Sequence, residues 1–195
     1  MTDKPTYYDK RADFWKKYWE MALTYDEFMN IDPENAPRWH DFMARVPDLN
    51  DEQKARLQDY NRIVKVLVYG GVWCGDCVRQ GPIFKKIADT TDDMEIRFID
   101  RDISDELQDE VRILGATRVP IVIFLTEDYW EVGREGDRLL PVYRAKAARE
   151  IGRGQALGVL SPKAIEDQLD LWVDIFERAI IMTKLSPPLR KRHHD

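Results

Sequence analysis

Residues 63–77 read IVKVLVYGGVWCGDC. The apolar run 63–69 that opens this stretch is typical of a buried β-strand. Cys74 and Cys77, the only two cysteines of the chain, follow it after a short link that contains two glycines. The stretch therefore predicts a C-x-x-C pair at the point where a strand ends and a helix begins.

A thiol at the N-terminus of a helix has altered chemistry. It faces unpaired backbone N–H groups and the positive end of the helix dipole, and both favour the thiolate. The pKa of such a cysteine can fall from about 8.5 to roughly 3.5–7.5. Because the thiolate is the nucleophile of disulfide exchange, we interpret the pair as a dithiol–disulfide centre. Cys74 would attack, and Cys77, one helical turn further on, would resolve.

Composition sets the broad class. The chain has 195 residues, of which 44% are hydrophobic and 34% charged, as in a soluble globular domain with or without an extension. Its net charge of −6 does not indicate a nucleic-acid partner, and no apolar stretch approaches the roughly 20 residues of a membrane span. Residues 1–9 contain no apolar signal-peptide core. We therefore expect a cytoplasmic protein, in which a C-x-x-C is more often catalytic or metal-binding than structural.

The pattern of elements changes near residue 60. Three helical pieces are predicted before it, at 9–29, 32–44 and 51–60, and we interpret residues 1–59 as a helical N-terminal extension. Tryptophan and tyrosine are frequent in this extension, and their rings are expected to pack it onto the main domain; a partner-binding surface is the alternative.

Residues 60–185 alternate between strands and helices. We predict strands at 62–69, 95–99 and 121–125, and helices at 75–90, 104–114 and 162–184. After Asp128 we expect a hairpin with Gly133 and Gly136 in its turn and residues 139–144 as the returning strand, then a loop or short helix over 145–158. The basic residues 186–195 are expected to form a flexible, frayed tail. This order predicts an α/β domain with a central mixed β-sheet flanked by helices.

Three further features carry a resemblance to a known family. The motif Trp73-Cys74-Gly75-Asp76-Cys77 is followed by Pro82 in the predicted helix and by Val119-Pro120 just before an apolar strand. In this combination, residues 62–126 resemble thioredoxin. The resemblance implies a thioredoxin-like fold, a kink at Pro82, and a cis peptide bond before Pro120 that faces the cysteines. It also implies that the Val119 backbone pairs with an extended substrate chain.

The chain departs from typical thioredoxins in ways that affect the site. Val68 stands where the resemblance implies a buried acid, and Asp76 stands where proline is usual. A carboxylate near Cys74 repels a thiolate, so we expect the pKa of Cys74 to be higher than in a proline variant. Asp76 is either a substitute proton donor or a plain helix-start residue. Arg118 is either an exposed loop residue or a cation that stabilises the thiolate or binds an acidic substrate, and Trp73 is expected to cover one side of the thiols.

The resulting hypothesis is a thiol–disulfide oxidoreductase. It would act on disulfide-containing proteins and would bind no cofactor, taking electrons from a reductase or a low-molecular-weight thiol. The alternative is a non-catalytic thioredoxin-like adaptor or redox-sensor module. A zinc site is not expected, since two cysteines supply only half of a tetrahedral site and the three histidines lie far away in sequence.

Overall fold

A four-stranded mixed sheet forms the centre of the protein. The computed structural model describes residues 6–153 and 160–194. The strands are β1 (Val64–Gly70), β2 (Met94–Asp100), β3 (Ile121–Thr126) and β4 (Glu131–Gly136). Their order is β2-β1-β3-β4, with β1 parallel to β2 and the other pairs antiparallel. The mixed sheet predicted from the sequence is confirmed.

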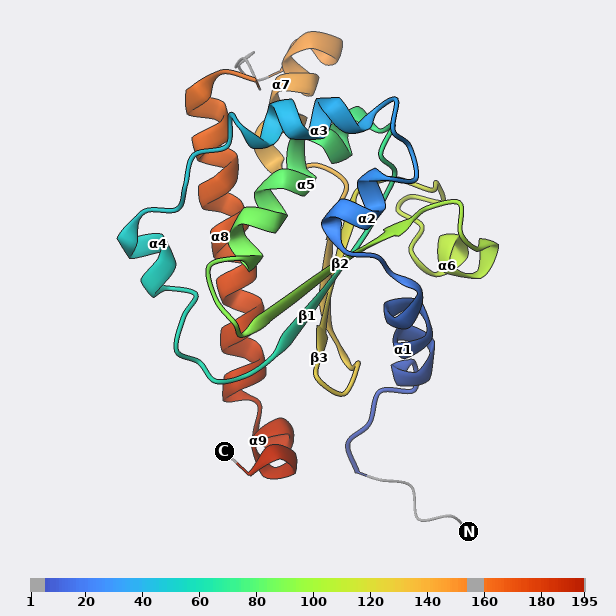
Figure 1. Ribbon diagram of the computed structural model, residues 1–195, viewed down its shortest axis with the longest axis vertical. Helices are drawn as coiled ribbons and strands as arrows, with labels where there is room; N and C mark the ends of the chain where they lie inside the picture. The colour runs from blue at the N-terminus through green and yellow to red at the C-terminus, as the bar shows by residue number, and fades with distance from the viewer. Residues whose placement is uncertain (1–5, 154–159, 195) are drawn as a thin grey trace.

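Helices cover both faces of the sheet. Figure 1 shows α5 (Gly75–Ala88) and α8 (Pro162–Leu185) on one side, and α1 (Ala12–Met21) and α6 (Asp105–Glu110) on the other. Every residue of the central strands β1 and β3 is buried, which is why their sequences are almost continuously apolar. Neither α8, the longest helix, nor any other described helix combines the length and apolarity needed to cross a membrane.

The predicted helix over 9–29 is in fact two helices. α1 ends at Met21, and Leu23 then forms a bridge with Phe98 of β2, with an N–H···O distance of 2.8 Å. Thr24 starts α2 (Tyr25–Met29) through a capping box with Glu27. The segment continues through α3 (Ala36–Met43) and α4 (Asp51–Ala55).

The aromatic rings of the N-terminal segment belong to the same core as the sheet. Trp15, Phe28 and Trp39 are almost completely buried. Phe28 stacks on Phe98 of β2 with ring centroids 5.6 Å apart, and Trp39 meets the same ring edge-on. The predicted packing onto the main domain is confirmed for Trp15 and Trp39, whereas Tyr7 and Tyr8 are exposed.

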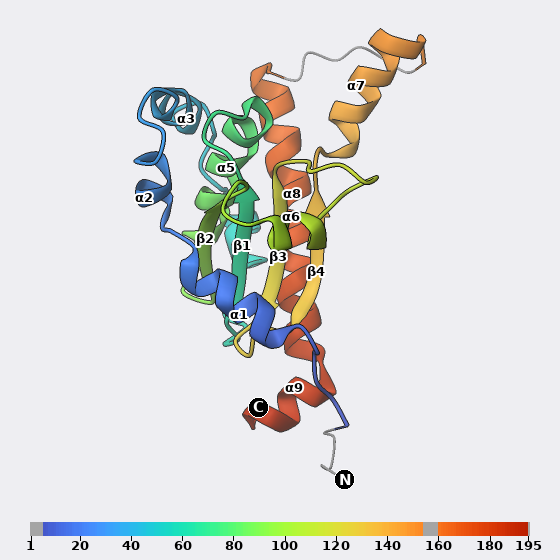
Figure 2. The same ribbon diagram turned by 90° about the vertical axis from the view of Figure 1, so that its right-hand side faces the viewer.

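The predicted hairpin after Asp128 is wrong in both its turn and its returning strand. Gly133 and Gly136 lie within β4, and residues 139–144 do not return as a strand. Instead, α7 (Leu140–Ile151) follows and ends at Gly152, whose φ is 64°. Pro141 in its first turn and the alanines that follow favour a helix over a strand. Figure 2 shows α7 extending away from the sheet, and Gly154 and Gly158 of the expected loop lie outside the described residues.

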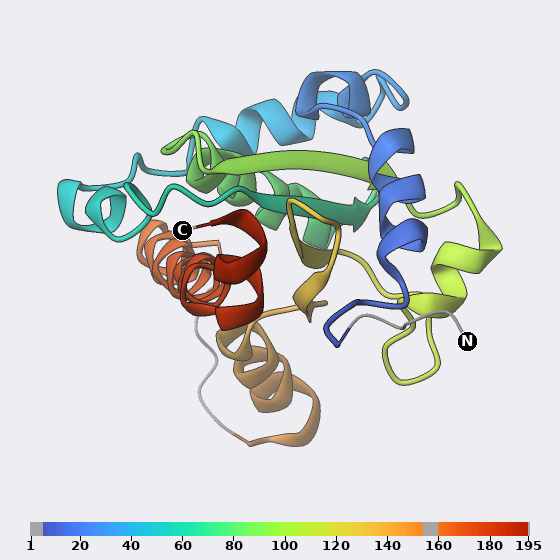
Figure 3. The same ribbon diagram turned by 90° about the horizontal axis from the view of Figure 1, so that it is seen from below.

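The basic C-terminal segment is also ordered differently from the expected frayed tail. Residues Pro187–His193 form α9, which lies against the end of the sheet domain in Figure 3. Two prolines preset the helical φ of its first turn, and Leu189 is buried. The His193 ring nitrogen Nε2 lies 2.8 Å from Asp128 Oδ2. An apolar anchor and a side-chain contact thus hold a segment whose charge suggested a free tail.

Candidate active site

The two cysteines occupy the predicted position at the start of α5. Cys74 is the N-cap residue, and the backbone N–H of Cys77 donates to Cys74 Sγ at 3.3 Å. Both thiols are free, and the two cysteines lie 3.2 Å apart. The strand-to-helix turn therefore brings a dithiol together within one helical turn.

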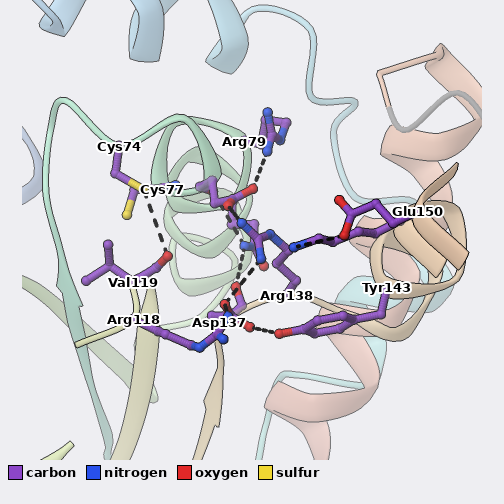
Figure 4. Close-up of polar contacts among 12 residues, drawn as sticks. Cys74, Cys77, Arg79, Arg118, Val119, Asp137, Arg138, Tyr143 and Glu150 are labelled. Carbon is purple, nitrogen blue, oxygen red and sulfur yellow. Dashed lines mark hydrogen bonds and ion pairs between the residues drawn. The ribbon is translucent and has the colours of Figure 1, made fainter. Parts of the chain in front are cut away.

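The segment before β3 lies opposite the pair, as Figure 4 shows. The peptide bond between Val119 and Pro120 is cis, as the resemblance implied. The Cys74 thiol donates to the Val119 carbonyl oxygen at 3.8 Å. The residue before the cis proline thus lies beside the sulfur of the candidate nucleophile.

The pKa values of the two thiols are shifted in opposite directions. The pKa of Cys74 is lowered to about 6, chiefly because the Cys77 thiol donates a hydrogen bond to it. Burial opposes this shift, the backbone N–H groups of Cys77 and Asp76 add to it, and the negative charge of Asp76 opposes it. The pKa of Cys77 is raised well above its usual value by burial and by its bond to Cys74. Cys74 is 7% exposed and Cys77 1%, so the outer thiol is the more acidic one.

Asp76, between the cysteines, points to two arginines. Its carboxylate forms an ion pair with Arg79 one turn along α5. Its other oxygen lies 2.5 Å from Arg138 Nη2, on the link between β4 and α7. The side chain is 13% exposed, so this contact is largely sheltered from solvent. Its repulsive effect on the Cys74 thiolate agrees in direction with the expectation from the sequence, whereas its role as a proton donor stays a prediction.

Arg118 binds a buried carboxylate. Its Nη1 lies 3.0 Å from Asp137 Oδ2, and the Tyr143 hydroxyl donates to the other oxygen of the same carboxylate. Gln80 of α5 donates to the Asp137 carbonyl oxygen at 2.9 Å. Burial alone would raise the pKa of Asp137, but the hydrogen bonds from Tyr143 and Arg118 lower it below its usual range. Asp137 thereby connects α5, the segment before β3, and α7.

No sequence pattern predicts this second group of residues. Asp137, Arg138 and Tyr143 come together because residues 140–151 form a helix, whereas the sequence pattern was interpreted as a returning strand. Pro141 was the available signal, since proline is favoured in the first turn of a helix.

Helix α3 supports the loop that carries Trp73. The Trp39 indole N–H donates to the Val72 carbonyl oxygen at 2.8 Å, and Arg38 Nη1 donates to the Trp73 carbonyl oxygen at 3.1 Å. A Cβ added at Gly75 would lie 3.5 Å from Arg38 Nη2. The Trp73 ring itself is 44% exposed and lies under the Arg101 guanidinium, 5.0 Å from it. The N-terminal segment thus frames the site.

Strand β1, which leads into the cysteine motif, carries no acidic residue. Val68 occupies the position where the resemblance implied a buried acid. Val68 is 1% exposed. Across the described ranges 6–153 and 160–194, no three His, Cys, Asp or Glu side chains gather as a metal ion would require.

Comparison with known proteins supports the fold. No curated protein matches the chain at a significant level. Two solved structures share its fold: a protein of unknown function from Pseudomonas aeruginosa, with 21% identity and a TM-score of 0.61, and an HIV epitope scaffold, with 21% identity and a TM-score of 0.60. The alignments cover 82% of this chain and 97% of the first, and 80% and 96% for the second.

The family match begins earlier in the chain than the motif resemblance. A family model described as thioredoxin matches residues 22–144, which is more than half of the chain and includes α2, α3 and α4. The chain therefore belongs to the thioredoxin family.

Proposed function

We propose that this protein is a thiol–disulfide oxidoreductase that uses Cys74 and Cys77. The observation that carries the proposal is the Cys74 sulfur at the N-terminus of α5, with the Cys77 thiol beside it and a lowered pKa. Membership in the thioredoxin family supports it.

The order of the reaction steps follows from the pKa values of Cys74 and Cys77. The Cys74 thiolate attacks one sulfur of a substrate disulfide, and the other substrate sulfur leaves as a thiolate that takes up a proton. Cys77 then loses its proton and attacks the Cys74 sulfur of the mixed disulfide, which releases the second substrate thiol. Two electrons have passed from the protein dithiol to the substrate, and the protein is left with a Cys74–Cys77 disulfide.

Turnover requires a partner that returns the pair to the dithiol. We propose a reductase or a low-molecular-weight thiol in this role, and disulfide-containing proteins of the cytoplasm as substrates. The Val119 backbone, beside the Cys74 sulfur, is suited to pair with an extended chain that presents its disulfide.

Reduction of a disulfide-linked peptide by the dithiol protein tests the proposal. Cys74→Ser should abolish the reaction, because the attacking sulfur is gone. Cys77→Ser should stop it one step later and accumulate a Cys74 mixed disulfide, detectable by intact mass. Full activity of the Cys74→Ser variant would refute the proposal.

A second candidate rests on the burial of the pair. Cys74 is only 7% exposed, which restricts the approach of a folded protein substrate. This favours a binding module whose cysteines sense redox state rather than turn over. Rapid oxidation by small disulfides together with no activity on protein disulfides would support this candidate over the first.

A further inference from the structure

The acid inside the cysteine motif is held by an arginine from a distant part of the chain. Asp76 Oδ2 lies 2.5 Å from Arg138 Nη2, although the two residues are 62 positions apart in the sequence. Their side chains are 13% and 24% exposed, so solvent screens this ion pair less than an open surface pair.

Arg138 is itself held in place by neighbours. Its Nη1 lies 3.4 Å from Asp137 Oδ2, the same oxygen that binds Arg118 beside the cis peptide bond. Tyr143 of α7 donates to the other oxygen of Asp137. Figure 4 shows Arg138 between the first turn of α5 and the start of α7, with Asp137 next to it. The guanidinium is therefore fixed where it can neutralise Asp76.

The charge of Asp76 matters because it lies next to the nucleophile. The carboxylate disfavours the Cys74 thiolate, and it is two residues from Cys74 on the same turn. Arg79 offers one compensating charge from the same helix, and Arg38 of α3 lies close to Gly75. Arg138 supplies the compensating charge on the side of Asp76 that faces the β4–α7 link.

We propose that Arg138 is a positioning residue for Cys74: it neutralises Asp76 and holds its carboxylate toward the start of α7, so that an acid within the motif does not suppress the thiolate. The inference rests on the proposed function, since it assigns a purpose to a reactive Cys74. It also means that α7 is coupled to the active site, because Tyr143 of its first turn holds Asp137, which in turn binds Arg138.

The test is the pH profile of Cys74 alkylation by iodoacetamide, followed by peptide mass. Arg138→Gln removes the charge and should raise the apparent pKa of Cys74 by about 0.5–1 unit, which makes alkylation at pH 6 roughly two- to fivefold slower. The same change in an Asp76→Asn background should shift the pKa less, because the charge that Arg138 neutralises is absent. Arg149→Gln is the matched control: this arginine of α7 is 72% exposed and pairs with Glu150, so the pKa should not change.

Two outcomes overturn the inference. One is an unchanged pKa in Arg138→Gln, and the other is an equal shift in the presence and absence of Asp76. If thermal unfolding shows that Arg138→Gln does not fold, the variants Arg138→Lys and Asp76→Asn test the inference instead. The lysine variant should keep most of the native pKa, and the asparagine variant should lower it; a raised pKa in the asparagine variant would contradict the inference.

This readout separates the inference from the proposed function. Alkylation reports the acidity of Cys74 without any disulfide substrate. An inactive protein with the expected pKa differences would count against disulfide exchange alone, whereas an active protein without them would count against Arg138 alone.

Discussion

At the scale of single residues, the two thiols of the site differ because one lies at the start of a helix and the other inside it. Cys74 receives hydrogen bonds from Cys77 and from the backbone, which lower its pKa to about 6. Cys77 is buried among apolar groups, which raises its pKa. The same burial that makes Cys77 a poor nucleophile in the dithiol keeps its proton available for the bond to Cys74.

This difference predicts a pH profile for the dithiol protein. A group with a pKa of about 6 is about nine-tenths ionised at pH 7, against about one-hundredth for a thiol with a pKa of 9. The alkylation rate of Cys74 should therefore rise from pH 4 and level off above pH 7. Iodoacetamide labelling with peptide mapping measures it.

Cys77 is the internal control for that profile. It should remain unmodified in the range where Cys74 reacts, because its thiol is protonated and 1% exposed. A Cys74 rate that keeps rising to pH 9 would contradict the lowered pKa.

At the scale of elements, the active-site helix depends on close packing against α3. A Cβ added at Gly81 would lie 2.0 Å from Trp39 Cζ3, and Trp39 is 1% exposed. Gly81→Ala should therefore destabilise the protein by about 1–3 kcal/mol, although alanine is the better helix former. Gly133→Ala is the control, since its Cβ would have no neighbour within 4 Å. Urea unfolding measures both, and equal stabilities would contradict the packing described.

The elements also show where reasoning from sequence succeeds. The strand, the cysteine turn, α5 and the cis bond at Pro120 follow from local pattern and resemblance, because a buried strand and a helix start leave strong local signals. The helix α7 and the contact of Trp39 with the Val72 carbonyl depend on tertiary neighbours. Residues 139–144 form a short apolar run that fits a strand as well as a helix, and within that run only the proline distinguishes the two.

At the scale of the whole molecule, the C-terminal helix α9 packs onto the central domain. Leu189 of α9 is 4% exposed, whereas Leu185 at the end of α8 is 66% exposed. Leu189→Ala should cost about 2–3 kcal/mol of unfolding free energy because it leaves a cavity. Leu185→Ala, the same change at an exposed position, should alter stability by less than about 0.5 kcal/mol. If denaturant unfolding gave equal values for the two variants, α9 would not be part of the folded domain.

The network around Asp137 extends this connection to the active site. It joins α5, the segment before β3, and α7, and none of these is close to the others in sequence. The sequence alone could not reveal it, because single charged residues in predicted loops and turns carry no pattern that identifies their partners.

The central claim is that Cys74 and Cys77 form a reversible dithiol–disulfide pair. A redox titration in glutathione or dithiothreitol buffers, read by thiol alkylation and intact mass, tests it most directly. The account predicts one two-electron transition at roughly −270 to −180 mV, the range from reducing to isomerising dithiol enzymes. A pair that stays as two free thiols across that whole range would contradict it.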